Sequence, residues 1–116
     1  MVAGRAAEQA AAEHLEHAGF RILQRNFRAR GGELDLVATE GRVLAIVEVR
    51  YRASDRFGGA AASITSGKQQ RIIRAARALL VARPELARLP ARFDVVEVSG
   101  AIDSLCCRLI RSAFSL

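Results

Sequence analysis

The feature that most constrains this fold is a pair of apolar runs, residues 33–39 and 43–52, separated by Glu40-Gly41. Runs of this length, rich in Leu, Val and Ile and joined by an acidic residue and a glycine, are typical of a β-hairpin. A turn centred on Glu40-Gly41 pairs Thr39 with Arg42, and this pair fixes the register of both strands. The sequence therefore predicts a sheet at the centre of the molecule.

Helical and extended patterns surround this hairpin. Strong helix formers with an apolar stripe predict a helix over residues 2–18, ended by Gly19. A second helix is expected after a cap at Ser63, Thr65 or Ser66, with a proline to stop it. Further strands are expected at residues 20–27, 92–98 and 101–110, and a glycine-containing flexible loop follows Arg52.

The resulting order, α-β-β-β-α-β-β, predicts an α/β fold with a mixed central sheet of about five strands flanked by helices. A chain of 116 residues suffices for one modest core, so we expect one domain over residues 1–116. With 51% hydrophobic residues a disordered chain is not expected. No apolar run approaches the ~20 residues of a membrane span, and no secretory signal is visible. A cytoplasmic protein without a membrane partner is the expectation.

The cysteines and histidines carry no predicted chemistry. Cys106 and Cys107 are adjacent, which suits neither a loop-closing disulfide nor a zinc site. We expect both in a strand in a reducing compartment, one facing inward and one outward. His14 and His17 are expected on the surface of the first helix.

The charge of the chain is strongly basic and depends on arginine. Seventeen arginines and a single lysine, Lys68, give a net charge of +6. Such an excess favours a polyanionic partner, because arginine contacts to phosphate release counterions. Codon preference combined with a solvated surface explains the same excess, and both explanations stay open here.

The hairpin register brings acidic residues together. It sets Glu33 opposite Glu48, and Asp35 opposite Ile46 and diagonal to Glu48. The strand period of two puts Glu33 and Asp35 on one face, and Glu48 and Arg50 on the matching face of the next strand. Like charges placed so closely are destabilising unless they are neutralised, and carboxylate oxygens suit Mg²⁺ or Mn²⁺.

Two further points bear on this acidic patch. Glu8 lies on the inner stripe of the first helix and is a candidate fourth acid. The alternative is a water-exposed sheet face on which these charges form salt bridges without a metal.

Several motifs run in order through nearly the whole chain. They are Gly4-Arg5-Ala-Ala-Glu8, Gly19-Phe20, Arg25-Asn26-Phe27-Arg28, Gly32-Glu33-Leu34-Asp35-Leu36, Val47-Glu48-Val49-Arg50-Tyr51-Arg52, Lys68-Gln69, Arg92-Phe93-Asp94-Val95-Val96 and Ala113-Phe114. On these motifs the chain resembles the YraN-like family of bacterial proteins. That family resembles the PD-(D/E)XK nucleases, which have a restriction-endonuclease-like fold, and most nearly the archaeal Holliday-junction resolvases. The resemblance implies a divalent-metal-dependent endonuclease acting on DNA, branched DNA included.

The resemblance also implies roles for individual residues. Asp35 matches the metal-binding acid of the superfamily, and Glu48 matches the acid of its (D/E)XK element. Glu33 matches the family's Gly-Glu-(Ile/Leu)-Asp signature and is a further candidate metal ligand. Glu8 matches the helix-one acid of the resolvase-like branch, and Gln69 a polar position near the start of the second helix.

One departure from the motif concerns chemistry. Arg50 stands where the superfamily has the lysine that orients water or stabilises charge. Arginine can hold a phosphate in two contacts but cannot act as a base. Three hypotheses follow: Arg50 only holds phosphate while a metal-bound hydroxide attacks, Lys68 supplies the ammonium, or catalysis is lost and a nucleic-acid-binding or assembly module remains.

The basic residues supply candidate nucleic-acid contacts. Arg71, Arg74 and Arg77 recur at three-residue spacing on the second helix, where a phosphate-binding face and a plain solvated face are both consistent with the sequence. Arg52 and Arg56 lie in or beside the loop that follows the hairpin. The candidate contacts are Arg5, Arg52, Arg56 and Arg71, with DNA as the expected partner and a homodimer expected by analogy.

Overall fold

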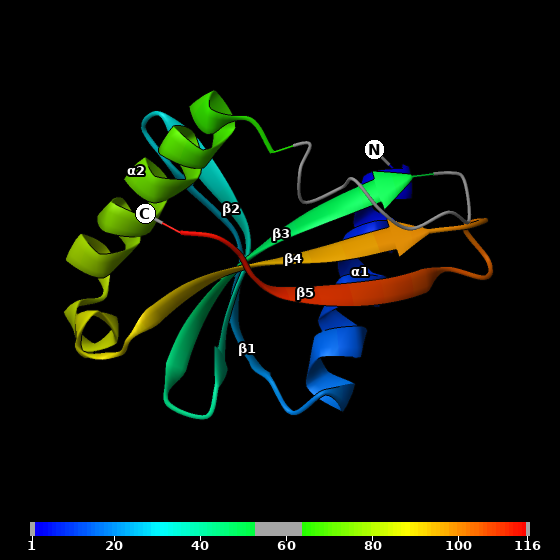
Figure 1. The fold of residues 1–116 in the computed structure, drawn as a ribbon, viewed down its shortest axis with the longest axis horizontal. Coiled ribbons are helices and arrows are strands. Elements are labelled where there is room, and N and C mark those ends of the chain that lie inside the picture. The colour runs from blue at the N-terminus through cyan, green and yellow to red at the C-terminus, as the bar shows by residue number, and fades with distance from the viewer. Residues whose placement is uncertain (1, 53–63, 116) are drawn as a thin grey trace.

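A computed structural model describes residues 2–52 and 64–115 (Figure 1). Its elements are α1 (Val2–His17), β1 (Arg21–Ala29), β2 (Gly32–Glu40), β3 (Val43–Arg52), α2 (Ser66–Ala82), the 3-10 helix η1 (Pro84–Arg88), β4 (Ala91–Ser99) and β5 (Cys106–Phe114). The predicted order of helices and strands is confirmed, and so is the α/β class with a five-stranded mixed sheet.

The sheet follows the chain order, β1-β2-β3-β4-β5. All neighbouring strands are antiparallel except β3 and β4, which run parallel. Parallel neighbours need a crossover connection, and α2 with η1 supplies it. The hairpin strand β3 is therefore central, with β2 on one side and β4 on the other.

Each face of the sheet carries its own apolar cluster. On one face Ile72 and Leu79 of α2 pack with Leu34, Ile46 and Phe93 of the sheet. On the other face α1 packs against the sheet, and the sheet residues of this cluster lie in all five strands or directly before them. Its fully buried members include Ala11, Leu15, Leu36, Val47 and Val96. The two helices thus cover opposite faces.

The predicted hairpin register is wrong, because the turn lies one residue later in the chain than predicted. Glu40 pairs with Val43, so the turn residues are Gly41 and Arg42 rather than Glu40 and Gly41. Gly41 adopts a φ of +59°, and a glycine in the first position is what a type II′ hairpin turn requires. The shift places Asp35, rather than Glu33, on the step across from Glu48.

The last strand also begins later than predicted, at Cys106 instead of residue 101. Gly100 has a φ of +99°, and the Ser104 N–H donates to the Ala101 carbonyl at 2.9 Å, so these residues form a turn. Ile102, an apolar residue within the predicted strand, is 47% exposed in this turn. The predicted strand placement of both cysteines holds, with Cys106 exposed and Cys107 half-buried.

Other boundaries agree within a few residues. Thr65 caps α2 through a hydrogen bond from the Lys68 N–H at 3.2 Å. The predicted loop after β3, Arg56 within it and the alternative cap Ser63 lie outside the described residues. In the described part of the chain no helix is long and apolar enough to cross a membrane.

Both edge strands of the sheet contain a residue in the left-handed region. Asn26 on β1 and Ser112 on β5 each have a φ of +53°. The β4–β5 register shifts between Phe93 and Val95, and the displaced Ser112 N–H donates to a carboxylate oxygen of Asp94 at 2.9 Å. A β-bulge of this kind bends an edge strand locally.

Candidate active site

Asp35 and Glu48 come together where the β2–β3 ladder ends. The last backbone pair is Leu36 with Val47, and the next step sets Asp35 across from Glu48. There the Val49 N–H donates to Oδ2 of Asp35 at 2.8 Å, so a side chain replaces a backbone acceptor. A side-chain hydrogen bond joins Asp35 to Glu48. The two strands therefore separate at the point where the carboxylates meet.

The β2 strand does not alternate regularly around Asp35. Leu34 belongs to the cluster under α2, whereas Leu36 belongs to the cluster under α1. Residues two apart on a regular strand would lie on the same face. The predicted sharing of one face by Glu33 and Asp35 assumed regular alternation, and β2 departs from it at this residue.

The Asp35 carboxyl titrates far from its ordinary range. Burial is the main cause that raises its pKa to about 7, and the charge of Glu48 adds to it. The Val49 N–H and the Lys68 charge act in the opposite direction. Glu48 is only 7% exposed. A buried pair of carboxylates with so little compensation holds a proton near neutral pH, or takes a cation in its place.

The cation nearest to this pair comes from α2. Lys68 lies in the first turn of that helix, and its Nζ is 2.9 Å from Oε1 of Glu48. The two carboxylates, Lys68 and Arg71 line one pocket of about 200 Å³, together with Gly32 and Glu33. The predicted Lys68 is thus brought to the acids by the structure.

Gly32 determines how closely α2 approaches the acids, and the sequence interpretation did not assign it this role. A Cβ at this position would lie 2.2 Å from the Arg71 carbonyl oxygen and 3.3 Å from the Ala75 Cβ. Only a residue without a side chain allows the helix backbone to pack there. The glycine of the Gly-Glu-Leu-Asp motif was the available signal.

Glu33 and Glu8 lie at the margin of the pocket. Glu33 lines it and also lines a neighbouring hollow of about 520 Å³, which it shares with Glu8, Arg5, Asn26 and others. Burial raises the pKa of Glu8, its hydrogen bond to Asn26 lowers it, and the charges of Asp35 and Glu33 raise it further. Glu8 therefore interacts with the charges of Asp35 and Glu33 from the α1 side, but it does not line the pocket that contains Asp35 and Glu48.

Arg50 and Gln69 are not among the described residues that line the pocket. Arg50 pairs with Glu97 in the parallel β3–β4 register, and its buried Nε has no hydrogen-bond partner within residues 2–52 and 64–115. The Gln69 amide donates to the Ile64 carbonyl at 3.1 Å, so it holds the start of α2.

The candidate nucleic-acid contacts are distributed around these two hollows. Arg71 lines the acidic pocket and Arg5 the hollow beside it. Arg52 is exposed at the end of β3. Arg56 lies outside the described residues, so its prediction is not tested.

The donor set at the pocket suits a hard divalent cation. Within the described ranges no three His, Cys, Asp or Glu side chains are grouped closely enough to hold a metal together. Mg²⁺ is commonly held by one or two carboxylates, with water and substrate phosphate completing its shell. Asp35 and Glu48 fit that requirement.

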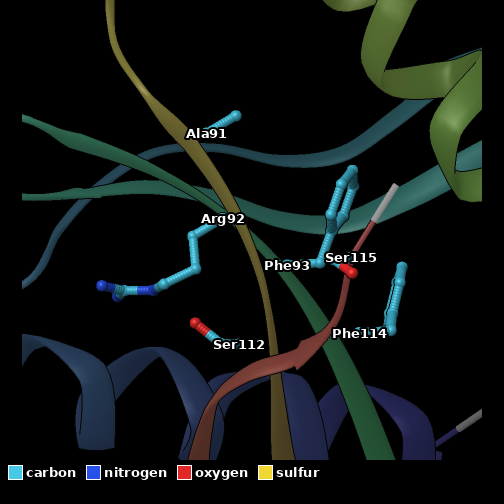
Figure 2. A pocket seen from close by; sticks show the side chains of 6 residues that line it. All are labelled: Ala91, Arg92, Phe93, Ser112, Phe114 and Ser115. Carbon is cyan, nitrogen blue, oxygen red and sulfur yellow. The ribbon is translucent and has the colours of Figure 1, made fainter.

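A larger hollow, of about 570 Å³, lies where β4 begins and β5 ends (Figure 2). Figure 2 shows the Arg92 side chain directed away from the rings of Phe93 and Phe114, which stack with centroids 4.9 Å apart. The Arg92 guanidinium donates to the fully buried Asp94 at 2.8 Å and to Glu40 at 2.6 Å. Its charge is thus used within the protein, and the hollow offers little chemistry.

Comparison with known proteins identifies the family. The model of the uncharacterised protein family UPF0102 matches residues 7–98. The chain belongs to the UPF0102 family. A UPF0102 protein of Xanthomonas campestris pv. campestris is 51% identical over 113 residues, 97% of this chain and 91% of the relative. A UPF0102 protein of Symbiobacterium thermophilum is 49% identical over 112 residues, 96% of this chain and 94% of the relative.

A third UPF0102 protein, from Dechloromonas aromatica, is 50% identical over 97 residues, 84% of this chain and 78% of the relative. These matches confirm the YraN-like resemblance at the level of the family. The UPF0102 match begins within α1 and ends within β4, so it includes every described residue that lines the acidic pocket.

Proposed function

We propose that this UPF0102 protein is a divalent-metal-dependent endonuclease that hydrolyses phosphodiester bonds in DNA, branched DNA included. The observation that carries the proposal is the buried Asp35–Glu48 pair with the Lys68 ammonium 2.9 Å from Glu48. The resemblance to PD-(D/E)XK nucleases and archaeal Holliday-junction resolvases supports the same reaction. A cytoplasmic location, a DNA partner and a homodimer are parts of this proposal.

Each residue of the pocket has a role in this reaction. Asp35 and Glu48 would hold Mg²⁺ or Mn²⁺, which when bound supplies an activated water and neutralises charge on the phosphate. Lys68 stabilises the negative charge that develops on the phosphate, because its ammonium lies at the carboxylate pair. Arg71 binds a phosphate oxygen at the rim of the same pocket.

The geometry favours Lys68 over Arg50 for the role of the superfamily lysine. Lys68 lines the pocket and contacts Glu48, whereas Arg50 is not among the described lining residues. Arginine also cannot release a proton at the pH of a cell. Arg50 is then free to hold phosphate or to pack.

A non-catalytic nucleic-acid-binding or assembly module is the second candidate function. The observation that favours it is the Lys68–Glu48 ion pair itself, which neutralises one carboxylate without a metal. Such a module would bind DNA in a salt-sensitive way and without dependence on Mg²⁺ or Mn²⁺. A Glu48→Gln variant would then keep its DNA affinity.

Cleavage of defined DNA separates the two candidates. The purified protein is incubated with linear duplex, single-stranded and four-way-junction DNA, with Mn²⁺, Mg²⁺ or a chelator. We expect metal-dependent cleavage that falls at least ~100-fold in Asp35→Asn and Glu48→Gln. Asp103→Asn, the same change at an exposed turn residue, is the matched control. Cleavage no higher than that of Asp35→Asn on every substrate would contradict the nuclease proposal.

A further inference from the structure

The outer face of α2 is basic, and the helix itself contains no acidic residue that could neutralise it. The helix sequence, SGKQQRIIRAARALLVA, contains four cations and no acidic residue. Ile72, Ile73, Ala75 and Leu79 are buried against the sheet. Arg71, Arg74 and Arg77 are all exposed on the opposite face, where Val81 is 82% exposed.

These arginines differ from those that hold the fold together. Arg92 and Arg111 both bind Glu40, at 2.6 Å in each case. By contrast, within residues 2–52 and 64–115 Arg71, Arg74 and Arg77 form no ion pair with a carboxylate. Their charge is available to an anionic partner, whereas the charge of Arg92 and Arg111 is already compensated.

The three arginines are spread across the exposed face instead of lying in one line. A step of three residues turns back by about 60°, so Arg71 and Arg77 are about 120° apart around the axis and about 9 Å apart along it. Arg71 lines the acidic pocket, and Arg77 lines an apolar hollow with Leu80 and Phe93 on the other flank. Arg74 lies between them, with its Cδ 3.7 Å from the Cβ position of Gly31.

We infer that α2 binds in a groove of duplex DNA, with phosphates of the two strands on its two flanks. A helix seated in a groove has one phosphate wall on each side, whereas a single strand would follow only one flank. The major groove of B-form DNA admits an α-helix, and that of A-form RNA is too deep and narrow. The DNA strand whose phosphates contact Arg71 would pass the Asp35–Glu48 pocket, which Arg71 also lines. Only the delivery of that strand to the pocket rests on the proposed nuclease function.

DNA binding without cleavage tests this inference. Affinity for a short linear DNA duplex, its single strand and the matching RNA duplex is measured in chelator, in the Asp35→Asn background. The triple variant Arg71→Gln/Arg74→Gln/Arg77→Gln removes the cations of α2. The matched control, Arg21→Gln/Arg42→Gln/Arg88→Gln, removes the same charge from exposed arginines elsewhere.

We expect the α2 triple variant to bind duplex DNA at least ~10-fold more weakly at ~0.1 M salt, with a salt slope smaller by ~3, and the control to lose less than ~3-fold. The single variants Arg71→Gln and Arg77→Gln should each weaken duplex binding, and the two losses should be similar to each other. Equal losses in both triple variants, or equal binding of the single strand or the RNA duplex, would overturn the inference. A protein that binds duplex DNA in this way but never cleaves it refutes only the nuclease proposal.

Discussion

At the scale of single residues, the pocket depends on a carboxyl group that the fold does not favour in its charged form. Asp35 is buried beside Glu48, and these two effects raise its pKa to about 7. One Lys68 charge and one Val49 N–H offset them only in part. A residue that costs stability when ionised is typical of functional sites rather than of structural ion pairs.

Replacement of Asp35 should therefore stabilise the protein at high pH. A folded pKa above the unfolded value means that the native state binds more protons between about pH 4 and 7, so wild-type stability falls as pH rises through that window. We expect Asp35→Asn to raise the free energy of unfolding by roughly 1–3 kcal/mol at pH 8 and to change it little near pH 4. Urea unfolding at both pH values measures this, and Asp103→Asn serves as the control. A destabilised Asp35→Asn protein at pH 8 would contradict the assignment.

The choice between Arg50 and Lys68 is a second prediction at this scale. We expect Lys68→Ala to lower the metal-dependent cleavage rate at least ~100-fold, because the ammonium at Glu48 is lost. Arg50→Lys should leave the rate within about threefold of wild type, because Arg50 is not among the described residues of the pocket. Arg42→Lys, the same change in the exposed β2–β3 turn, is the control. A large gain of rate in Arg50→Lys would instead assign the chemistry to position 50.

At the scale of elements, the site is a contact between one hairpin and one helix. β2 and β3 supply the carboxylates, and α2 supplies Lys68 and Arg71. The distance between the two parts is limited by Gly32, against which the Arg71 carbonyl packs. A small change in this contact would move the cations relative to the acids.

Two glycine substitutions, one at this contact and one away from it, should have opposite effects on stability. Gly32→Ala places a methyl group 2.2 Å from a backbone oxygen, so we expect a loss of about 1–3 kcal/mol in unfolding free energy from overpacking. Gly67→Ala in the first turn of α2 meets only the Thr65 hydroxyl, at 4.0 Å, and should gain about 0.5–1 kcal/mol from helix propensity. Thermal unfolding of both variants measures the pair. Similar changes in the unfolding free energy of both variants would show that α2 can move away from residue 32.

At the scale of the whole molecule, a charged network joins strands that are not neighbours. Glu40 at the end of β2 binds Arg92 of β4 and Arg111 of β5. Both guanidinium groups also lie over the Phe20 ring, 5.9 and 5.6 Å from its centroid. This network connects β2, β4 and β5 at one end of the sheet. Glu40 pairs with Val43 at the start of β3, so Glu48 lies five residues farther along that strand.

Acid should break this network in a defined window. The hydrogen bond from Arg111 is the main cause that lowers the pKa of Glu40, to about 2. Because the folded pKa is lowered, the stabilisation is complete above about pH 4.5 and is lost as pH falls toward 2. Glu40→Gln should cost about 1–3 kcal/mol at pH 7 and much less at pH 2, by thermal unfolding. Glu85→Gln, which breaks only the exposed pair with Arg83, should cost under about 1 kcal/mol.

The sequence predicted the order of elements well because apolar runs and stripes are separated by glycine, proline and polar turn residues. It also indicated Asp35, Glu48 and Lys68 as candidate site residues, and all three line one pocket. It failed where the geometry depended on one turn residue, since the conformation of Gly41 decides the register and hence which acid faces Glu48. The role of Gly32 depends on a helix distant in sequence, and the motif glycine marks the position without indicating which element packs against it.

The left-handed residues on the two outer strands affect how this protein meets other chains. A straight outer strand offers a row of free backbone groups, onto which a foreign strand can add and begin aggregation. Asn26 and Ser112 interrupt the extended backbone of β1 and β5, the β4–β5 register shifts between Phe93 and Val95, and the Ser112 N–H is already bound to Asp94. We therefore expect the sheet to resist growth by strand addition at high concentration, so that partners approach through its helices and hollows.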